Sequence, residues 1–417
     1  MRVAVIGAGT AGPAAALLLA RAGAEVTLFE AVPEPGPVGA GLLIQPTGAA
    51  VLARLGLARS VIGRAARIER LFGQSVDGRV VMDLAYGDLQ AGLFGAGVHR
   101  GSLFTALFDA LPEAGIAVRT GCPVDDLAQR DGLFDLLGPD GAAGFDLVIV
   151  ADGARSTLRA RVAPVRRADP YPYGALWFIG GDPDGSYDGV LCQDYRDTRE
   201  MMGTLPSGRI HEGDPAPMVS LFWSLRVDAM DATRAAGLDA WRAGAEALNP
   251  RIAPLVAQVE HMDQLLGATY RSVVMDRCWR TTDRAGAVVL GDAAHAMSPQ
   301  LGQGANLALV DAAALADALI EGGALERRDR IGPALAAYQR SRRANVGYYQ
   351  LASRWLTPLF QSDHAWVAWW RDRLMHPSAA VPWIRRQMLE SLAGTKTGLL
   401  TATPLTPAIQ QKSGRDL

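Results

Sequence analysis

The chain carries two glycine-rich segments almost three hundred residues apart, and each follows an apolar run and precedes an alanine-rich run. The first, Gly7-Ala8-Gly9-Thr10-Ala11-Gly12, comes after residues 3–6 and leads into residues 13–22. A buried strand, a glycine turn and a helix in this order are typical of a βαβ unit in a parallel sheet. This feature places the start of the chain in the α/β class.

Each glycine of this turn has a separate physical role. Gly7 permits a tight turn, Gly9 lets the backbone approach a pyrophosphate, and Gly12 lets the helix pack closely on the strand. The free amides at the helix N-terminus then face an anion. A second strand over 25–29 ends before Glu30, whose carboxylate can bind both hydroxyls of an adenosine ribose and disfavours a 2′-phosphate. The segment therefore predicts a dinucleotide of the FAD or NAD type.

The second segment distinguishes between these dinucleotides. Residues 285–290 are predicted to form another buried strand, which Gly291-Asp292 caps before a polar glycine-rich turn leads into a helix beginning near Ala305. The positive end of that helix would stabilise the negative charge that develops on the pyrimidine side of a reduced flavin. Asp292 would accept hydrogen bonds from the ribityl hydroxyls. We therefore expect FAD.

Three motifs in this order resemble the FAD-dependent aromatic hydroxylases, the group A flavoprotein monooxygenases with a para-hydroxybenzoate hydroxylase-like fold. They are GAGTAG with Glu30, the Asp152-Gly153 stretch within 146–159, and the stretch from Gly291 to Asn306. The match covers about the first 160 residues and then 280–345. The resemblance implies a Rossmann-like FAD-binding domain.

The 417 residues are half apolar, so more than one compact unit is expected. We predict a discontinuous FAD-binding domain over 1–163 and 278–345. Between its parts, residues 164–277 alternate between apolar and polar side chains and predict an inserted, mostly antiparallel β-sheet substrate domain. Residues 60–82 add irregular structure or another strand. Residues 346–417 are expected to form C-terminal helices with a loose tail.

The resemblance also implies a set of cofactor contacts. Arg100, ahead of a helical pattern, is expected to point to the FAD pyrophosphate, and Val124 to offer backbone groups to adenine, although a buried strand valine is nearly as good an interpretation. Asp152 fits either a cofactor contact or a turn that closes a strand. The predicted contacts are Gly7, Gly9, Thr10, Ala11, Gly12, Glu30, Gly41, Arg100, Val124, Asp152, Asp292, Gly302, Gly304, Ala305 and Asn306.

Substrate contacts are harder to predict. Each candidate could equally be ordinary sheet packing or surface, except that the resemblance places Pro299 over the face of the flavin that reacts with oxygen. We do not assign His295 as a general base, because the family's histidine at this place usually supports the turn, and no catalytic residue is identified. The candidates are Trp177, Gln193, Tyr195, Phe222, Pro299 and Gln300.

The composition excludes some classes of protein. A formal net charge of −2 argues against nucleic acid as a partner. The three cysteines are far apart and the six histidines form no ligand cluster, so neither a disulfide framework nor a metal site is predicted. No apolar run approaches the ~20 residues that span a bilayer, and the first strand begins too early for a signal peptide. A reducing cytoplasm fits best.

Five of the nine tryptophans lie beyond residue 345. We favour helices that pack these side chains across the flavin and substrate domains. A subunit interface is the second interpretation, compatible with a monomer or a homodimer overall. Docking on a membrane surface is the third, because arginines accompany the tryptophans. The five are Trp355, Trp366, Trp369, Trp370 and Trp383.

The resemblance implies that NADPH or NADH delivers hydride to the FAD, and that dioxygen then yields a flavin C4a-hydroperoxide that hydroxylates a phenolic or other activated aromatic compound. The sequence does not choose between the two nicotinamides. A flavin-dependent halogenase should show a Trp-x-Trp-x-Ile-Pro stretch and a pocket lysine. The chain has no such stretch, and its only lysines, Lys396 and Lys412, lie near its end, so this class is not favoured. A monooxygenase acting on quinones or prenyl lipids, and a flavin-binding protein without turnover, remain as alternatives.

Overall fold

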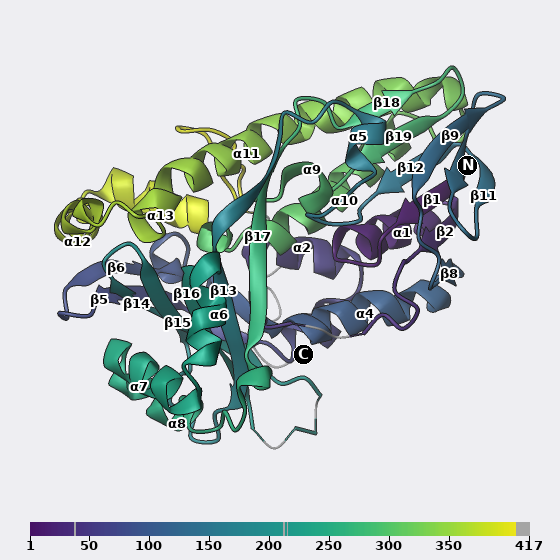
Figure 1. Cartoon of the computed structure of the whole chain (residues 1–417). Helices are drawn as coiled ribbons and strands as arrows, with labels where there is room; N and C mark the ends of the chain where they lie inside the picture. Colours follow the sequence, from purple (N-terminus) through teal and green to yellow (C-terminus); the bar gives the residue numbers. More distant parts are fainter. Residues whose placement is uncertain (37–38, 212, 215, 406–417) are drawn as a thin grey trace.

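The first glycine turn joins the first two strands of a six-stranded sheet in the computed structural model, which describes residues 1–36, 39–211, 213–214 and 216–405 (Figure 1). All neighbours in this sheet are parallel except β18, which is antiparallel to β19. The strand order is β18 (Trp279–Thr281), β19 (Gly286–Val289), β12 (Leu147–Val150), β1 (Arg2–Ile6), β2 (Glu25–Phe29) and β8 (Ala117–Arg119).

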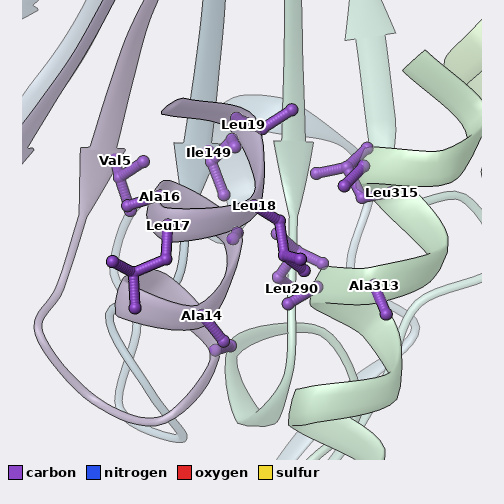
Figure 2. Packing of buried hydrophobic residues seen from close by; sticks show 14 of the residues in the cluster. Val5, Ala14, Ala16, Leu17, Leu18, Leu19, Ile149, Leu290, Ala313 and Leu315 are labelled. Atoms are coloured by element: carbon purple, nitrogen blue, oxygen red, sulfur yellow. The ribbon is translucent and has the colours of Figure 1, made fainter. Parts of the chain in front are cut away.

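The helices after the two glycine segments pack against each other beside this sheet. Helix α1 (Ala11–Arg21) follows the first segment and α10 (Gly304–Glu321) begins within the second. Leu17, Leu18 and Leu19 of α1 are at most 5% exposed and share one core with the strands and with α10 (Figure 2). The sheet thus combines segments from the start and the last third of the chain, which confirms the predicted discontinuous Rossmann-like fold.

A seven-stranded sheet forms the second layer of the molecule. All its neighbours are antiparallel except β14 and β5, so the mostly antiparallel prediction is confirmed. The strand order is β17 (Leu266–Val274), β13 (Arg167–Gly181), β16 (Met218–Arg226), β15 (Glu200–Gly208), β14 (Val190–Arg196), β5 (Arg70–Ser75) and β6 (Val80–Ala85).

The two faces of this second sheet are used differently. On β16 the alternate residues Val219, Leu221, Trp223 and Leu225 are buried in a cluster with the 230–265 segment. That segment contains α6 (Met230–Ala235), α7 (Leu238–Leu248) and α8 (Ala253–Val256), with α7 and α8 on the side away from the first sheet (Figure 1). The opposite face is therefore available to the FAD-binding layer.

The two layers meet at a three-stranded sheet of β3 (Gly41–Ile44), β7 (Gly95–His99) and β4 (Ala66–Ile68). A Cβ atom on Gly97 of β7 would lie 1.8 Å from the carbonyl oxygen of Pro206 in β15. The backbones of the two layers therefore touch at this point, which only glycine allows.

The remaining elements complete the layers. The other three-stranded sheet has the order β11 (Ala142–Phe145), β10 (Leu133–Leu137) and β9 (Asp126–Arg130). The other helices are α2 (Pro46–Arg54), α3 (Ala58–Ile62), α4 (Arg100–Glu113), α5 (Arg159–Val162), α9 (Asp292–His295), α11 (Ile331–Phe360), α12 (Trp366–Ser378) and α13 (Pro382–Leu392). The 3-10 helices are η1 (Tyr86–Asp88), η2 (Val227–Ala229), η3 (Pro250–Ile252), η4 (Met262–Gln264), η5 (Pro299–Leu301) and η6 (Arg328–Arg330).

Two predicted domain edges cut through continuous structure. Residues 70–85, inside the range 1–163, join the second sheet because β5 pairs in parallel with β14 and covers its free edge. Helix α11 runs without interruption across the predicted edge at residue 345. The division into three domains stays a prediction, and these contacts place its edges differently.

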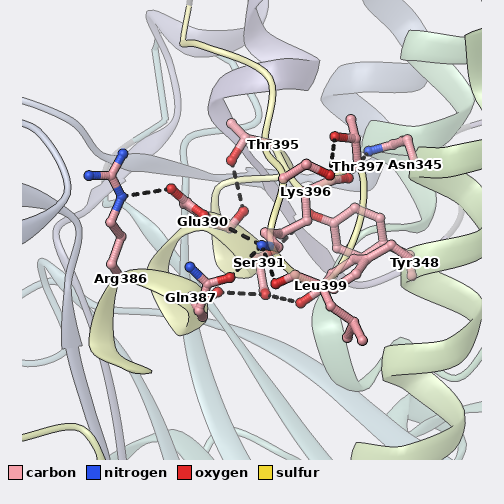
Figure 3. Close-up of polar contacts among 12 residues, drawn as sticks. Asn345, Tyr348, Arg386, Gln387, Glu390, Ser391, Thr395, Lys396, Thr397 and Leu399 are labelled. Atoms are coloured by element: carbon pink, nitrogen blue, oxygen red, sulfur yellow. Dashed lines mark hydrogen bonds and ion pairs between the residues drawn. The ribbon is translucent and has the colours of Figure 1, made fainter. Parts of the chain in front are cut away.

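The start of the C-terminal tail is not loose. Thr395 is 3% exposed and Lys396 is fully buried, where its Nζ donates to the Leu399 carbonyl and lies 3.6 Å from a Glu390 carboxylate oxygen (Figure 3). The side-chain amide of Asn345 on α11 donates to the Lys396 carbonyl. These contacts correct the expectation of a loose tail for residues 395–405, and residues 406–417 lie outside the described part of the chain.

The five C-terminal tryptophans correct another expectation. They do not pack between the layers but face solvent, with exposed fractions from 49% to 73%. The inward side of α12 is occupied instead by Ala368 and Arg371, which are 6% and 2% exposed. Among the described residues, no helix is long and apolar enough to cross a bilayer.

The contact at Gly97 yields the first prediction. Gly97→Ala should lower the free energy of unfolding by about 1–3 kcal/mol, because the methyl group must push β7 away from the Pro206 carbonyl. Urea denaturation measures this change. Gly87→Ala is the control, since a Cβ there meets nothing within 4 Å. Equal stability of both variants would contradict the tight junction.

Candidate active site

The first glycine turn has the geometry that its spacing predicts. Gly7 has φ +103°, and a Cβ on it would lie 2.5 Å from the Ala151 carbonyl oxygen. A Cβ on Gly12 would lie 2.0 Å from the Gly7 carbonyl oxygen, whereas one on Gly9 would meet nothing within 4 Å. Gly7 and Gly12 are therefore required by the protein's own backbone, and Gly9 leaves open space at the N-terminus of α1, where Thr10 is the N-cap residue.

Glu30 follows β2 and faces the same turn. One carboxylate oxygen accepts a hydrogen bond from the Ala8 amide at 2.7 Å, and the other accepts one from the Val32 amide at 2.9 Å. These bonds fix the carboxylate beside the glycine turn, at the place that the ribose contact requires. The contact itself stays a prediction.

The second glycine segment lies at the same edge of the sheet. Because β1, β12 and β19 are parallel neighbours, the turns after their last residues meet there. Gly291 has φ +58°, and a Cβ on it would lie 3.1 Å from Cβ of Ala11 at the start of α1. Asp292 begins α9 with an exposed side chain. The fold thus brings together the three motifs that the sequence separates.

The polar turn before α10 is held by its own side chains. Gly302 adopts a left-handed conformation at φ +60°, and α10 starts at Gly304, so Ala305 is in its first turn. The side chain of Asn306 is buried, accepting from the Gln45 amide at 2.8 Å and donating to the Leu43 and Gly302 carbonyls. Asn306 therefore anchors the turn through its side chain, which leaves its backbone for the predicted cofactor contact.

Asp152 follows β12 between the two glycine segments. Burial raises the pKa of its carboxyl, and its Oδ1 is buried with no hydrogen-bond partner among the described residues. An unpartnered buried acceptor of this kind is satisfied when a hydroxyl donor binds. Together with the open space at Gly9 and the exposed Asp292, it fits a dinucleotide that carries ribose and ribityl hydroxyls.

Three other predicted contacts lie around this edge. Arg100 is the exposed first residue of α4, and its Cδ lies 2.9 Å from where a Cβ on Gly39 would be. The Gly41 amide donates to Ser220 Oγ at 2.7 Å, so Gly41 contacts the second sheet. Val124 is half-buried in the loop before β9, so the alternative of a strand valine is wrong.

Four predicted substrate residues come from one face of the second sheet. In the strand register Trp177 pairs with Phe222, Phe222 with Gly203, and Gly203 with Gln193. The rings of Trp177 and Phe222 have centroids 5.0 Å apart. A Cβ on Gly203 would lie 2.2 Å from Cζ of Phe222, so the missing side chain lets this ring lie against the strand.

Tyr195 and Gln193 are less accessible than Trp177. Tyr195 is fully buried, donates to Gln193 Oε1 at 2.6 Å, and packs its ring 5.2 Å from that of Phe360 on α11. Burial raises the pKa of the Tyr195 hydroxyl. The structure therefore gives Tyr195 a packing role that supports Gln193.

The turn at η5 brings the FAD-binding layer to this face. Pro299 is exposed, and the Gln300 side-chain amide lies 3.9 Å from Sδ of Met201 in β15. Met201 pairs with Tyr195 on one side and with Ser224 on the other. Ser224 lies two residues from Phe222, on the same face of the sheet. Gln300 Oε1 is buried with no partner among the described residues. The predicted substrate residues thus lie on two facing elements.

Sequence reasoning missed a buried ionic cluster under the second glycine segment. Asp311 on α10 is fully buried, and it accepts hydrogen bonds from the Gly291 amide at 3.0 Å, His295 Nε2 at 2.5 Å and Arg342 Nε at 2.7 Å. Burial alone would raise the pKa of Asp311, but the charges of His295 and Arg342 outweigh it and lower that pKa. The signal was a lone carboxylate on the apolar stretch 304–316.

The same cluster sets the protonation of His295. Burial opposes a charged imidazole, but the charge of Asp311 and its hydrogen bond outweigh burial and raise the pKa of His295. The His295 amide also donates to the Gly291 carbonyl at 3.0 Å, so this residue supports the turn, which agrees with our decision not to assign it as a base.

Comparisons with known proteins match this geometry. Residues 1–178 and 223–347 match the family model described as FAD binding domain. The chain belongs to this family. It is 31% identical over 325 residues to a 3-amino-4-hydroxybenzoate 2-monooxygenase from Streptomyces cremeus, covering 76% of this chain and 78% of that protein. It is 27% identical over 338 residues to a 6-hydroxynicotinate 3-monooxygenase from Pseudomonas fluorescens, covering 78% and 83%.

Solved structures share the fold. PqsL, a probable FAD-dependent monooxygenase from Pseudomonas aeruginosa, has a TM-score of 0.74 at 22% identity, covering 88% of this chain and 98% of that chain. HpxO from Klebsiella pneumoniae, complexed with FAD and uric acid, has a TM-score of 0.75 at 20% identity, covering 94% and 97%. The resemblance inferred from the three motifs is confirmed.

The protein is an FAD-dependent monooxygenase of aromatic small molecules, in a family whose typical reductant is NADPH or NADH. When bound, FAD supplies the redox chemistry. In this flavoprotein monooxygenase the chain's own part would be to bind and orient: the α1 N-terminus would face an anion, the Asp152 oxygen would accept from a hydroxyl, and the aromatic row on the second sheet would exclude water from the substrate.

Gly9→Val tests the site. The larger side chain should fill the open space at the α1 N-terminus and weaken FAD binding by roughly 100-fold or more, because a pyrophosphate could no longer approach the backbone. Flavin absorbance of the purified protein measures this, with the melting temperature of the apoprotein as a check on folding. Asp292→Ala should also lose flavin, whereas Gly347→Val on the surface of α11 should not. Full flavin occupancy in both site variants would contradict the assignment.

His295→Asn gives a prediction about pH. Because the folded state raises the pKa of His295, protonation stabilises the fold fully below the ordinary pKa of about 6.5, and this contribution is lost as pH rises through the raised value. The variant should therefore lose about 3 kcal/mol near pH 6 and less at higher pH. Urea denaturation across pH measures this, and the exposed His364→Asn is the control. A loss that does not change with pH would contradict a charged His295.

Proposed function

We propose that the aromatic ring of the substrate binds between the second sheet and the η5 turn, against Trp177 and Phe222. The observation that carries this proposal is the tilted pair of these two rings, which lie on the sheet face turned to the FAD-binding layer. Aromatic side chains hold an aromatic ligand by offset or edge contacts. Pro299 and Gln300 supply the opposite side.

The polar groups at this face favour a substrate that donates hydrogen bonds. Gln300 Oε1 is a buried acceptor without a partner among the described residues. Gln193 Oε1 already accepts from Tyr195, so it is a weaker candidate. A phenolic hydroxyl or an aromatic amine would satisfy Gln300, and both groups also activate a ring toward an electrophilic hydroxyl. The relatives act on aromatic compounds with such groups, as their names 3-amino-4-hydroxybenzoate and 6-hydroxynicotinate monooxygenase state.

The proposal includes specific contacts for FAD. The amides of the α1 N-terminus and the Arg100 side chain would bind the pyrophosphate, Glu30 the ribose, and the Val124 backbone the adenine. Asp152 and Asp292 would bind hydroxyls, and the α10 N-terminus would face the pyrimidine side of the flavin. Support comes from the three turns meeting at one sheet edge. The full set is Gly7, Gly9, Thr10, Ala11, Gly12, Glu30, Gly41, Arg100, Val124, Asp152, Asp292, Gly302, Gly304, Ala305 and Asn306.

We further propose that the enzyme works in the cytoplasm, as a monomer or a homodimer. Cys122, Cys192 and Cys278 are free thiols, which a reducing compartment maintains. Size-exclusion chromatography with light scattering gives the oligomeric state.

Anaerobic titration of the purified holoprotein with NADPH and NADH, with and without a panel of phenols, aromatic amines and quinones, tests the substrate class. We expect one nicotinamide to bleach the flavin band near ~450 nm, faster when a phenol or aromatic amine is bound. Acceleration by quinones alone would favour the quinone-directed alternative. No reduction by either nicotinamide would contradict turnover.

Phe222→Leu tests the pocket itself. Loss of the ring should raise KM for the aromatic substrate about tenfold and leave FAD affinity unchanged, because Phe222 lies on the sheet and not at the glycine turns. Gly203→Ala should act in the same direction by displacing the ring. Gly267→Ala is the control, since Gly267 pairs with Leu176 on the opposite face of the sheet, and its Cβ would come no closer than 3.4 Å to Arg234. An unchanged KM in Phe222→Leu would place the substrate elsewhere.

A further inference from the structure

Helix α12 presents its large apolar side chains to solvent and buries one of its arginines, Arg371. Trp366, Trp370 and Leu374 are spaced by four residues and are 68%, 51% and 55% exposed. Trp369, 49% exposed, and Arg373 extend the same face. These five residues are called the α12 face below.

The opposite side of the helix explains this orientation. Arg371 is buried, with its guanidinium 4.7 Å from the Tyr195 ring centroid and one nitrogen donating to the Asp197 and Leu359 carbonyls. These contacts fix the rotation of α12, so its tryptophans cannot turn inward. The exposure is therefore built into the packing of the helix.

The C-terminal segment that carries the α12 face has more cationic than acidic side chains. Residues 346–405 hold six cationic and three acidic side chains. Each acid is already paired within the protein: Asp363 with Arg226, Asp372 with Arg371, and Glu390 with Arg386 and Lys396.

Arg373 differs from these paired cations. Its guanidinium lies 4.2 Å from the Trp369 ring centroid and has no acidic partner among the described residues. An exposed apolar face with an unneutralised cation fits an anionic partner.

The position of the face and its residue types indicate which anionic partner it fits. The exposed parts of its tryptophans and Leu374 amount to roughly 300–500 Å², the size of a large apolar patch on a monomer, which is often a binding site. The helix also lies at one end of the molecule, on its outer side (Figure 1). A row of indoles on an outer helix fits the headgroup region of a bilayer, where tryptophan and arginine are favoured.

We propose that the α12 face docks the enzyme on the surface of an anionic lipid membrane. Helix α12 lies in the plane of the bilayer surface, with its indoles among the headgroups and Arg373 near lipid phosphates. The inner side of the same helix contacts Tyr195 on β14, so docking places the substrate sheet one helix away from the lipid.

The test uses purified full-length holoprotein and vesicles of phosphatidylcholine, with and without phosphatidylglycerol. We expect the protein to sediment with vesicles that contain phosphatidylglycerol, with a blue shift of tryptophan emission. The variant Trp366→Ser/Trp370→Ser/Leu374→Ser should lose roughly tenfold or more in partitioning and keep its flavin and its NAD(P)H oxidation. Arg373→Gln should weaken binding to the anionic vesicles more than binding to phosphatidylcholine.

The control variant is Leu137→Ser/Ile320→Ser, which removes exposed apolar side chains of the FAD-binding layer and should partition like the natural chain. Absence of binding to anionic vesicles, or equal binding by the triple variant, would overturn the proposal. Light scattering adds a separate outcome, because a dimer that the triple variant converts to a monomer would make the α12 face an interface between two copies and overturn membrane docking.

Discussion

The close backbone approach at the carboxyl edge of the first sheet is the constraint on which the rest of the structure depends. The turn at Gly7 packs on the Ala151 carbonyl, and α1 packs through Gly12 on the Gly7 carbonyl. Parallel pairing of β1, β12 and β19 brings the third turn to the same edge, where Gly291 lies against Ala11. Because the turns contact one another through glycine, the remaining space at Gly9 is left for a cofactor.

The buried carboxylate of Asp311 stabilises the carboxyl edge of the first sheet, where it accepts from the Gly291 amide. It joins α9, α10 and α11 through His295, Arg342 and the Gly291 amide. A buried ionic cluster is costly to assemble but very costly to break, so it fixes a single arrangement of the three helices. Buried polar contacts also fix α12, because the hydrogen bonds of Arg371 determine the rotation of the helix and leave its tryptophans in solvent.

Much of the FAD-binding layer could be predicted, because its signals are local. The strands, turns and helices of the two glycine segments are contiguous in sequence, and their order alone implies a parallel sheet. The substrate face was predicted only as a set of strands. Which residues share a row, as Trp177, Phe222 and Gln193 do, depends on strand register, and period-two alternation does not specify the partner of each strand. Residues 60–82 were expected to add irregular structure or another strand, but the partner of that strand was not predicted, for the same reason.

The sequence by itself determined the class of fold, the FAD cofactor and the family, because glycine spacing and strand-ending acids are local requirements of backbone geometry. Tertiary structure decided three other features: the ionic cluster at Asp311, the burial of Lys396 in the C-terminal segment, and the outward direction of the α12 tryptophans. Each depends on which distant groups meet a side chain. A tryptophan has the same helical spacing whether its helix turns it inward or outward, and only the partners of Arg371 settle that direction.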